Sequence, residues 1–157
     1  MMEGVIRVLS TFILFPICLV MAVAVYTDIR RRLIYDWLTL PGIVYFLLVH
    51  AFLHSEQWFD YLLGVIVMGG ISLLMAILSR GQLGGGDIKL LALVGAAVGW
   101  QAGIYVLLFT YLLASFVAIP VWIVSKWRKN RERKLEFPMA PFIAGGTSLL
   151  ILIVFAQ

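Results

Sequence analysis

Hydrophobic residues in this chain gather in six long runs that short polar stretches separate. The runs cover residues 5–26, 38–53, 60–79, 88–100, 102–125 and 138–156. About 20 apolar residues in a helix cross the hydrocarbon core of a bilayer. The pattern therefore predicts an all-α integral membrane protein, a bundle of about six transmembrane helices. Because the run at 88–100 is short, five helices are the alternative if the boundary at residues 99–103 is misplaced.

The composition excludes a soluble globule. Of the 157 residues, 63% are hydrophobic and 13% are charged, which leaves too few polar side chains to cover a water-exposed surface. The single cysteine, Cys18, excludes a disulfide or a cysteine-based zinc site within one chain, and we expect it to be a buried thiol. No linker divides the sequence, so residues 1–157 are predicted to form one domain, with the first run too long for a signal peptide.

Basic residues follow alternate hydrophobic runs. Arg30–Arg32 follow the first run, Arg80 and Lys89 flank the loop after the third, and a basic segment at 126–134 follows the fifth. With six crossings these clusters share one face, which the positive-inside rule assigns to the cytoplasm. The basic segment is explained by orientation and anionic lipids, so we expect no nucleic-acid partner.

Two aspartates lie on this predicted cytoplasmic side. Asp28 comes where the first run ends, and Asp87 follows three glycines at the start of the fourth. Because charged groups are costly within a bilayer, such residues lie at the interface or have a function. Asp28 alone is explained by an ion pair with the arginines, and Asp87 alone by a helix N-cap. His50, His54, Glu56 and Asp60 form a weaker metal candidate, without diagnostic spacing.

Three segments resemble the motifs of the type IV prepilin peptidases. GGGDIKL at 84–90 looks like their GxGD motif, and DIRRRLI at 28–34, followed by WLTLP at 37–41, resembles their other aspartate motif. FPMAPFIAGG at 137–146 is similar to the proline-containing start of their last helix. The motifs occur in family order, and the resemblance covers most of the chain. The chain departs from the family at Asp36, where Ile-Tyr-Asp replaces the usual Ile-Pro-Asn.

The resemblance implies an aspartic endopeptidase of the bacterial cytoplasmic membrane that cleaves the leader peptide of prepilins or pseudopilins at the cytoplasmic face. Carried over, Asp28 and Asp87 are the catalytic pair, and Gly84, Gly85, Gly86 and Lys89 form the substrate-binding loop. No metal or other cofactor is implied. Longer family members insert a domain with paired Cys-x-x-Cys motifs and methylate the new pilin N-terminus. This chain resembles the short forms that serve Flp-type pili, so no methyltransferase activity is expected.

Elementary electrostatics supports this assignment. Two carboxylates about 5 Å apart repel by roughly 3 kcal/mol at an effective dielectric constant of about 20, which keeps one protonated near neutral pH. One carboxylate then activates water while the other donates a proton to the peptide carbonyl. Asp87 is the expected resting base, because it lies at a helix N-terminus whereas Asp28 lies near a helix C-terminus.

Several alternatives stay open from the sequence. The glycines allow a substrate backbone to approach closely, and Lys89 either stabilises the oxyanion or marks the membrane interface. Asp36, Glu132 and Glu136 are candidate contacts for a basic leader. A small proton-coupled transporter would use carboxylates nearer the bilayer midplane, and an assembly scaffold would need no paired acids.

Overall fold

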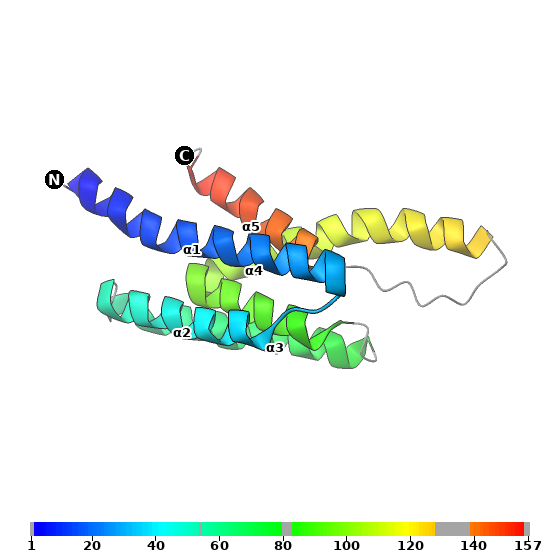
Figure 1. Cartoon of the computed structure of the whole chain (residues 1–157), viewed down its shortest axis with the longest axis horizontal. Coiled ribbons are helices and arrows are strands. Elements are labelled where there is room, and N and C mark those ends of the chain that lie inside the picture. The colour runs from blue at the N-terminus through cyan, green and yellow to red at the C-terminus, as the bar shows by residue number, and fades with distance from the viewer. Residues whose placement is uncertain (1, 54, 80–82, 128–138, 156–157) are drawn as a thin grey trace.

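The computed structural model describes residues 2–53, 55–79, 83–127 and 139–155, and these form a bundle of α-helices (Figure 1). The elements are α1 (Met2–Arg31), α2 (Asp36–Leu53), a single 3₁₀ turn η1 (Ser55–Gln57), α3 (Trp58–Leu78), α4 (Gly85–Trp127) and α5 (Ala140–Phe155). Within these ranges there is no β-strand. The prediction of an all-α protein is confirmed.

Helix α4 reverses direction at Gly99 without an intervening loop. Gly99 has φ 82° and ψ 174°, a backbone conformation that is essentially restricted to glycine. Figure 1 shows the first half of α4 (residues 85–98) and its second half (residues 100–127) running in opposite directions. The two halves correspond to the runs predicted at 88–100 and 102–125, so the uncertain boundary lies at Gly99. Counted separately, they give six α-helical segments in the described chain.

Glycines bring α3 and the first half of α4 into backbone contact. A Cβ atom on Gly64 would lie 2.2 Å from the carbonyl oxygen of Gly95, and one on Gly95 would lie 2.2 Å from that of Gly64. Small residues allow apolar helices to pack this closely in membranes. The Gly95 surface therefore packs against α3 within the bundle.

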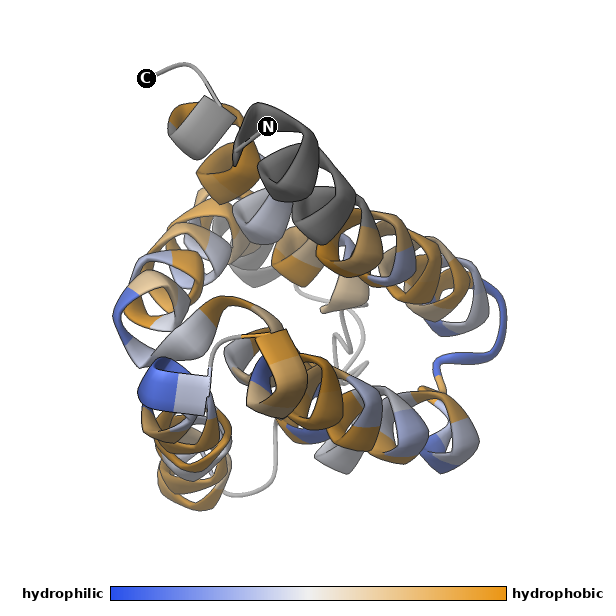
Figure 2. Cartoon of the chain, turned by 90° about the vertical axis from the view of Figure 1, so that its left-hand side faces the viewer, coloured by the Kyte–Doolittle hydropathy of each residue, from blue (hydrophilic) through white to orange (hydrophobic). Residues whose placement is uncertain are grey.

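The outer faces of the helices are apolar. Phe52 is 85% exposed and Phe116 is 80% exposed, and Figure 2 shows hydrophobic residues on all sides of the helices when the bundle is viewed end on. A surface of this kind belongs in lipid. Among the described residues, four helical spans are long and apolar enough to cross a membrane: Phe12–Arg31, Asp36–Leu53, Ser55–Leu78 and Gly85–Pro120. A shorter apolar helix follows at Ala140–Ile153. The chain is a multi-pass membrane protein.

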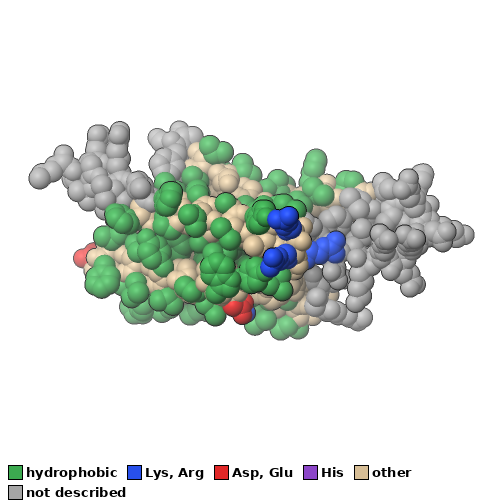
Figure 3. All heavy atoms as spheres, viewed as in Figure 1, with side chains coloured by type: hydrophobic (Ala, Val, Ile, Leu, Met, Phe, Trp, Pro, Cys, Tyr) green, Lys and Arg blue, Asp and Glu red, His purple; other side chains and the backbone are tan. Residues whose placement is uncertain are grey.

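Apart from Arg7, near the start of α1, the described Lys and Arg residues lie at one end of the bundle. Arg30, Arg31 and Arg32 lie where α1 ends, and Lys89 lies in the second turn of α4. On the face seen in Figure 3, Lys and Arg side chains gather toward that end and hydrophobic side chains cover most of the rest. The second half of α4, whose last two residues are Lys126 and Trp127, runs toward the same end (Figure 1). Arg80, His54 and residues 128–138, which include Glu132 and Glu136, lie outside the described residues.

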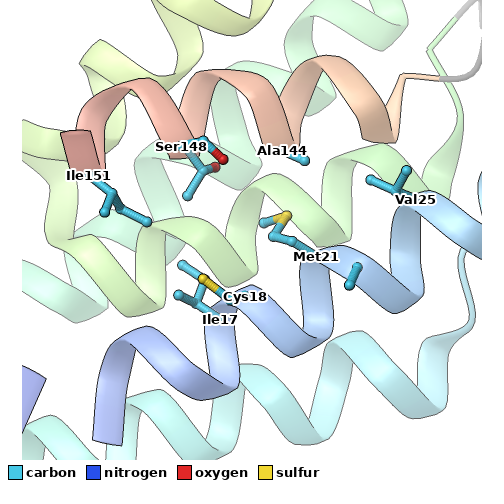
Figure 4. A pocket seen from close by; sticks show the side chains of 9 residues that line it. Ile17, Cys18, Met21, Val25, Ala144, Ser148 and Ile151 are labelled. Carbon is cyan, nitrogen blue, oxygen red and sulfur yellow. The ribbon is translucent and has the colours of Figure 1, made fainter. Parts of the chain in front are cut away.

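An apolar groove runs between α1 and α5 (Figure 4). Cys18 lies on its wall and is exposed, so the prediction of a buried thiol is wrong. The reason is that α1 packs with its neighbours through the adjacent face, where Ile17 and Met21 are buried. The groove is lined by side chains of α1 and α5: Ile17, Cys18, Met21, Ala22, Val25, Ala144, Thr147, Ser148 and Ile151.

Candidate active site

Asp28 lies in the last turn of α1 and is buried, with 7% of its surface exposed. Its Oδ2 atom accepts a hydrogen bond of 2.9 Å from the backbone N–H of Ala140, the first residue of α5. The first N–H groups of a helix have no partner within it, and the helix dipole favours an anion there. The N-terminus of α5 therefore holds the Asp28 carboxyl in place. No sequence pattern revealed this contact across 112 residues.

The chain leaves α1 abruptly after Asp28. Arg32 donates its backbone N–H to the carbonyl oxygen of Asp28 at 2.8 Å and has φ 51°, the left-handed conformation that ends many helices. The predicted run stopped at residue 26, whereas α1 continues to Arg31. Because the extra turn is helical, it turns Asp28 inward toward α5 and leaves Arg30 and Arg31 exposed.

Asp87 is the third residue of α4 and is also buried, with 8% of its surface exposed. Its backbone N–H donates to the carbonyl oxygen of Gly84 at 3.1 Å, and its carboxyl lies beside the backbone of Gly84. The N-cap alternative is therefore wrong in detail, because Gly84 precedes the helix and Asp87 lies within its first turn. A carboxylate in the first turn is stabilised by the helix dipole.

The three glycines before Asp87 are explained by three different surroundings. A Cβ atom on Gly84 would lie 3.1 Å from Oδ2 of Asp87, and one on Gly86 would lie 2.8 Å from Cβ of Ile34. Ile34 belongs to the segment between α1 and α2, so this close approach joins the two aspartate motifs. A Cβ atom on Gly85 would meet nothing within 4 Å. Gly84 and Gly86 thus shape the site, while Gly85 leaves space beside it.

The fold brings Asp28 and Asp87 together. They come from α1 and the first half of α4, both are buried, and the charge on Asp28 acts on the carboxyl of Asp87. Two buried carboxyl groups in mutual range can share one proton, because a second negative charge beside the first is unfavourable. Such a pair can accept a proton from water and donate one to a carbonyl oxygen.

Lys89 forms an ion pair with Asp36, an acid that the sequence motifs place near the site. Its Nζ atom lies 2.7 Å from Oδ1 of Asp36, and both side chains are substantially exposed. This ion pair links the start of α2 to the start of α4. The Lys89 ammonium is therefore directed toward Asp36 at the rim of the site. The spacing of 53 residues gave no signal for this contact.

Tyr111, in the second half of α4, is a neighbour of the site that sequence reasoning missed. The charge on Asp87 reaches its hydroxyl group. The only sequence signal for this proximity is equal spacing along the chain, because Asp87 and Tyr111 are each 12 residues from the turn at Gly99. That symmetry has meaning only once the chain is known to reverse there.

The described residues contain no group of three or more His, Cys, Asp or Glu side chains that could hold a metal ion. His50, one of the residues considered for such a site, is buried and lies against Ala97, far along α4 from Asp87. His54 lies outside the described residues.

Comparisons with known proteins agree with the motifs. The model of the type IV leader peptidase family matches residues 12–119, which include both aspartates. Proteins named prepilin leader peptidase/N-methyltransferase are similar to this chain. The protein of Aeromonas hydrophila is 30% identical over 138 residues, covering 83% of this chain and 46% of the relative. That of Pseudomonas aeruginosa is 32% identical over 131 residues, covering 78% and 43%.

A relative from Bacillus subtilis with the same name is 28% identical over 143 residues, covering 88% of this chain and 56% of the relative. The chain therefore spans about half the length of the curated relatives that it matches. No solved structure matches the chain significantly.

Proposed function

This chain belongs to the type IV leader peptidase family, and we propose that it is a membrane-embedded aspartic endopeptidase. Its substrates are type IV prepilins or pilin-like precursors, from which it removes the leader peptide. The observation that carries this proposal is the pairing of Asp28 and Asp87, two buried carboxyl groups held at the N-termini of α5 and α4. The names of the similar proteins support the substrate class.

The carboxyl pair divides the chemical work of peptide hydrolysis. One carboxylate takes a proton from a water molecule as that water attacks the scissile carbonyl carbon. The other carboxyl donates its proton to the carbonyl oxygen and stabilises the tetrahedral intermediate. No other described side chain at the site needs to change its protonation state.

Helix dipoles do not assign the two roles. The expectation that Asp87 is the resting base depended on Asp28 lying near a helix C-terminus. Asp28 does lie at the end of α1, but its carboxyl also accepts the N–H of Ala140 at the start of α5. Both carboxylates are therefore near a helix N-terminus, so the helix dipole does not distinguish them, and the role of Asp87 as the base stays a prediction.

Gly85 is the part of the loop that can receive the substrate. Gly84 and Gly86 already contact Asp87 and Ile34, whereas the side of Gly85 is open. A peptide bond must be in an extended segment to be cleaved, and an open glycine lets such a backbone approach closely. Lys89, paired with Asp36, lies at the rim of this approach.

The end of the bundle that carries the site faces the cytoplasm of a bacterium in this proposal. Arg30, Arg31 and Lys89 lie at that end, and cytoplasmic loops are enriched in basic residues. A proton-coupled transporter would have its carboxylates near the middle of its helices. Asp28 and Asp87 lie instead in the last turn of α1 and the first turn of α4, which favours the peptidase.

Co-expression with a prepilin tests the proposal. The wild-type protein should shorten the prepilin, whereas Asp28→Ala and Asp87→Ala should leave it intact while inserting into the membrane normally. Asp60→Ala is the matched control, because Asp60 is an exposed aspartate in the first turn of α3. An uncleaved prepilin with the wild-type protein contradicts the function, and cleavage by either site variant contradicts the catalytic pair. A radiolabelled methyl donor in the same assay tests the prediction of no methyltransferase activity.

A further inference from the structure

Tyr111 has a buried hydroxyl group that is not explained by packing. Its ring is partly buried against the hydrophobic core, and its Oη atom is buried without a hydrogen bond of good geometry in the part of the chain that the structure describes. Burying a hydroxyl group without a hydrogen bond is unfavourable. Phenylalanine would fill the same space without that penalty, so the hydroxyl group calls for a functional explanation.

The turn at Gly99 places Tyr111 level with Asp87. Gly95 and Gly103 are each four residues from Gly99, and Cβ atoms on them would lie 2.9 and 3.0 Å from Cγ of Met68 in α3. Residues equally far from the turn therefore lie at the same height in the two halves of α4. Asp87 and Tyr111 are each 12 residues from Gly99, so they lie at the same height too.

The Tyr111 hydroxyl group has two polar neighbours, Asp87 and Ser72. The charge on Asp87 acts on it, and the Ser72 side chain lies within its reach. Ser72, one turn after Met68 in α3, already donates its own hydroxyl proton to the carbonyl oxygen of Met68 at 2.6 Å. The Tyr111 hydroxyl group therefore lies near two polar side chains, Ser72 and Asp87, without a hydrogen bond of good geometry to either one.

We propose that Tyr111 is a positioning residue whose hydroxyl group donates a hydrogen bond to the Asp87 carboxyl when the peptide substrate binds. The inference rests on the proposed peptidase function. Hydrogen bonds of catalytic groups are often long or misaligned without substrate and tighten in the complex. The bond fixes the rotamer of Asp87 and stabilises its ionised form, which Asp28, the charged group acting on Asp87 from α1, disfavours.

Kinetics of Tyr111→Phe against pH tests the inference, with Tyr105→Phe as the matched control. Tyr105 is a 60% exposed tyrosine in the same half of α4. In Tyr111→Phe we expect kcat for prepilin cleavage to fall about 10-fold or more with KM within twofold, because a hydrogen bond to a charged group is lost. One limb of the pH profile should move up by about one pH unit. The acidic limb moves if Asp87 is the base, and the alkaline limb if Asp87 is the acid.

Tyr105→Phe should match the wild-type protein in both measurements. Replacement of Tyr111 by 4-aminophenylalanine, which keeps a donor at the same ring position, should restore most of kcat. Wild-type kcat and an unshifted pH profile in Tyr111→Phe overturn the inference alone. The same holds if 4-aminophenylalanine behaves like phenylalanine. Absence of cleavage by the wild-type protein instead overturns the proposed function on which the inference rests.

Discussion

Polar side chains are buried at both ends of the bundle, but their surroundings differ between the two ends. Near the first turn of α3, His50 is 1% exposed, its Nε2 atom lies 3.1 Å from the carbonyl oxygen of Ala97, and its ring stacks on Tyr61 with centroids 3.4 Å apart. At the other end, the carboxyl groups of Asp28 and Asp87 share one buried site, where their negative charges would repel each other. The first arrangement stabilises the fold, whereas the second conflicts with stability and carries the proposed chemistry.

The largest effect on activity is expected when one of the two buried carboxyl groups is removed. In Asp87→Asn the carboxylate is lost, so prepilin cleavage should fall by at least about 100-fold. The free energy of unfolding should not decrease, because the repulsion by Asp28 disappears at the same time. Unfolding in detergent and cleavage kinetics on the same preparation measure both effects. A variant that is both active and less stable would contradict the contrast between the two ends.

The opposite result is expected at the other end. His50→Ala should lower the free energy of unfolding by about 2–4 kcal/mol, since it leaves a cavity and an unpaired carbonyl group at Ala97. The kcat of the folded fraction should stay within about threefold of the wild-type value. His50→Gln, which retains a donor, should lose less stability. If kcat fell as far as in Asp87→Asn, the histidine end would have to belong to the active site.

At the end of the bundle that carries the two aspartates, substitution of Gly86 should lower stability, whereas substitution of Gly85 should hinder access of the substrate. Gly86→Ala should destabilise the protein by about 1–3 kcal/mol, because its Cβ atom would lie 2.8 Å from that of Ile34. Gly85→Ala should change stability by less than about 0.5 kcal/mol and should raise KM for the prepilin. Chemical unfolding and steady-state kinetics distinguish the two. Equal destabilisation by both variants would show that Gly85 is not open.

The smallest effect is expected for Lys89→Gln. Its ion pair with Asp36 is exposed, and such pairs contribute about 0–1 kcal/mol. Cleavage should stay within about threefold of wild type, because the ammonium group is directed to Asp36. A loss of about 100-fold or more would instead assign Lys89 to the oxyanion.

The parts of the structure that depend on local patterns were predictable. The runs at 38–53 and 60–79 agree with α2 and α3 to within two residues, because apolar length alone defines a membrane helix. The prediction that Asp28 and Asp87 lie at the same end of the bundle is confirmed. It was possible because basic residues and hydrophobic runs alternate regularly along the chain.

The parts that depend on contacts between distant segments were not predictable. The N–H of Ala140 at Asp28, the Lys89–Asp36 pair and the hydroxyl of Tyr111 all come from residues far apart in the sequence. Gly99 was recognised only as part of a boundary, because a glycine in an apolar run does not reveal its φ angle. Cys18 was misjudged because periodicity does not show which face of an apolar helix meets lipid.

Cleavage rates of Asp28→Asn, Asp87→Asn and the double variant test the central claim, that the two carboxyl groups act as one catalytic unit. Residues that act as a unit have strongly non-additive effects. Each single variant should therefore lose nearly as much prepilin cleavage as the double variant, at least about 100-fold. A single variant that keeps substantial activity, or losses that multiply in the double variant, would contradict the account.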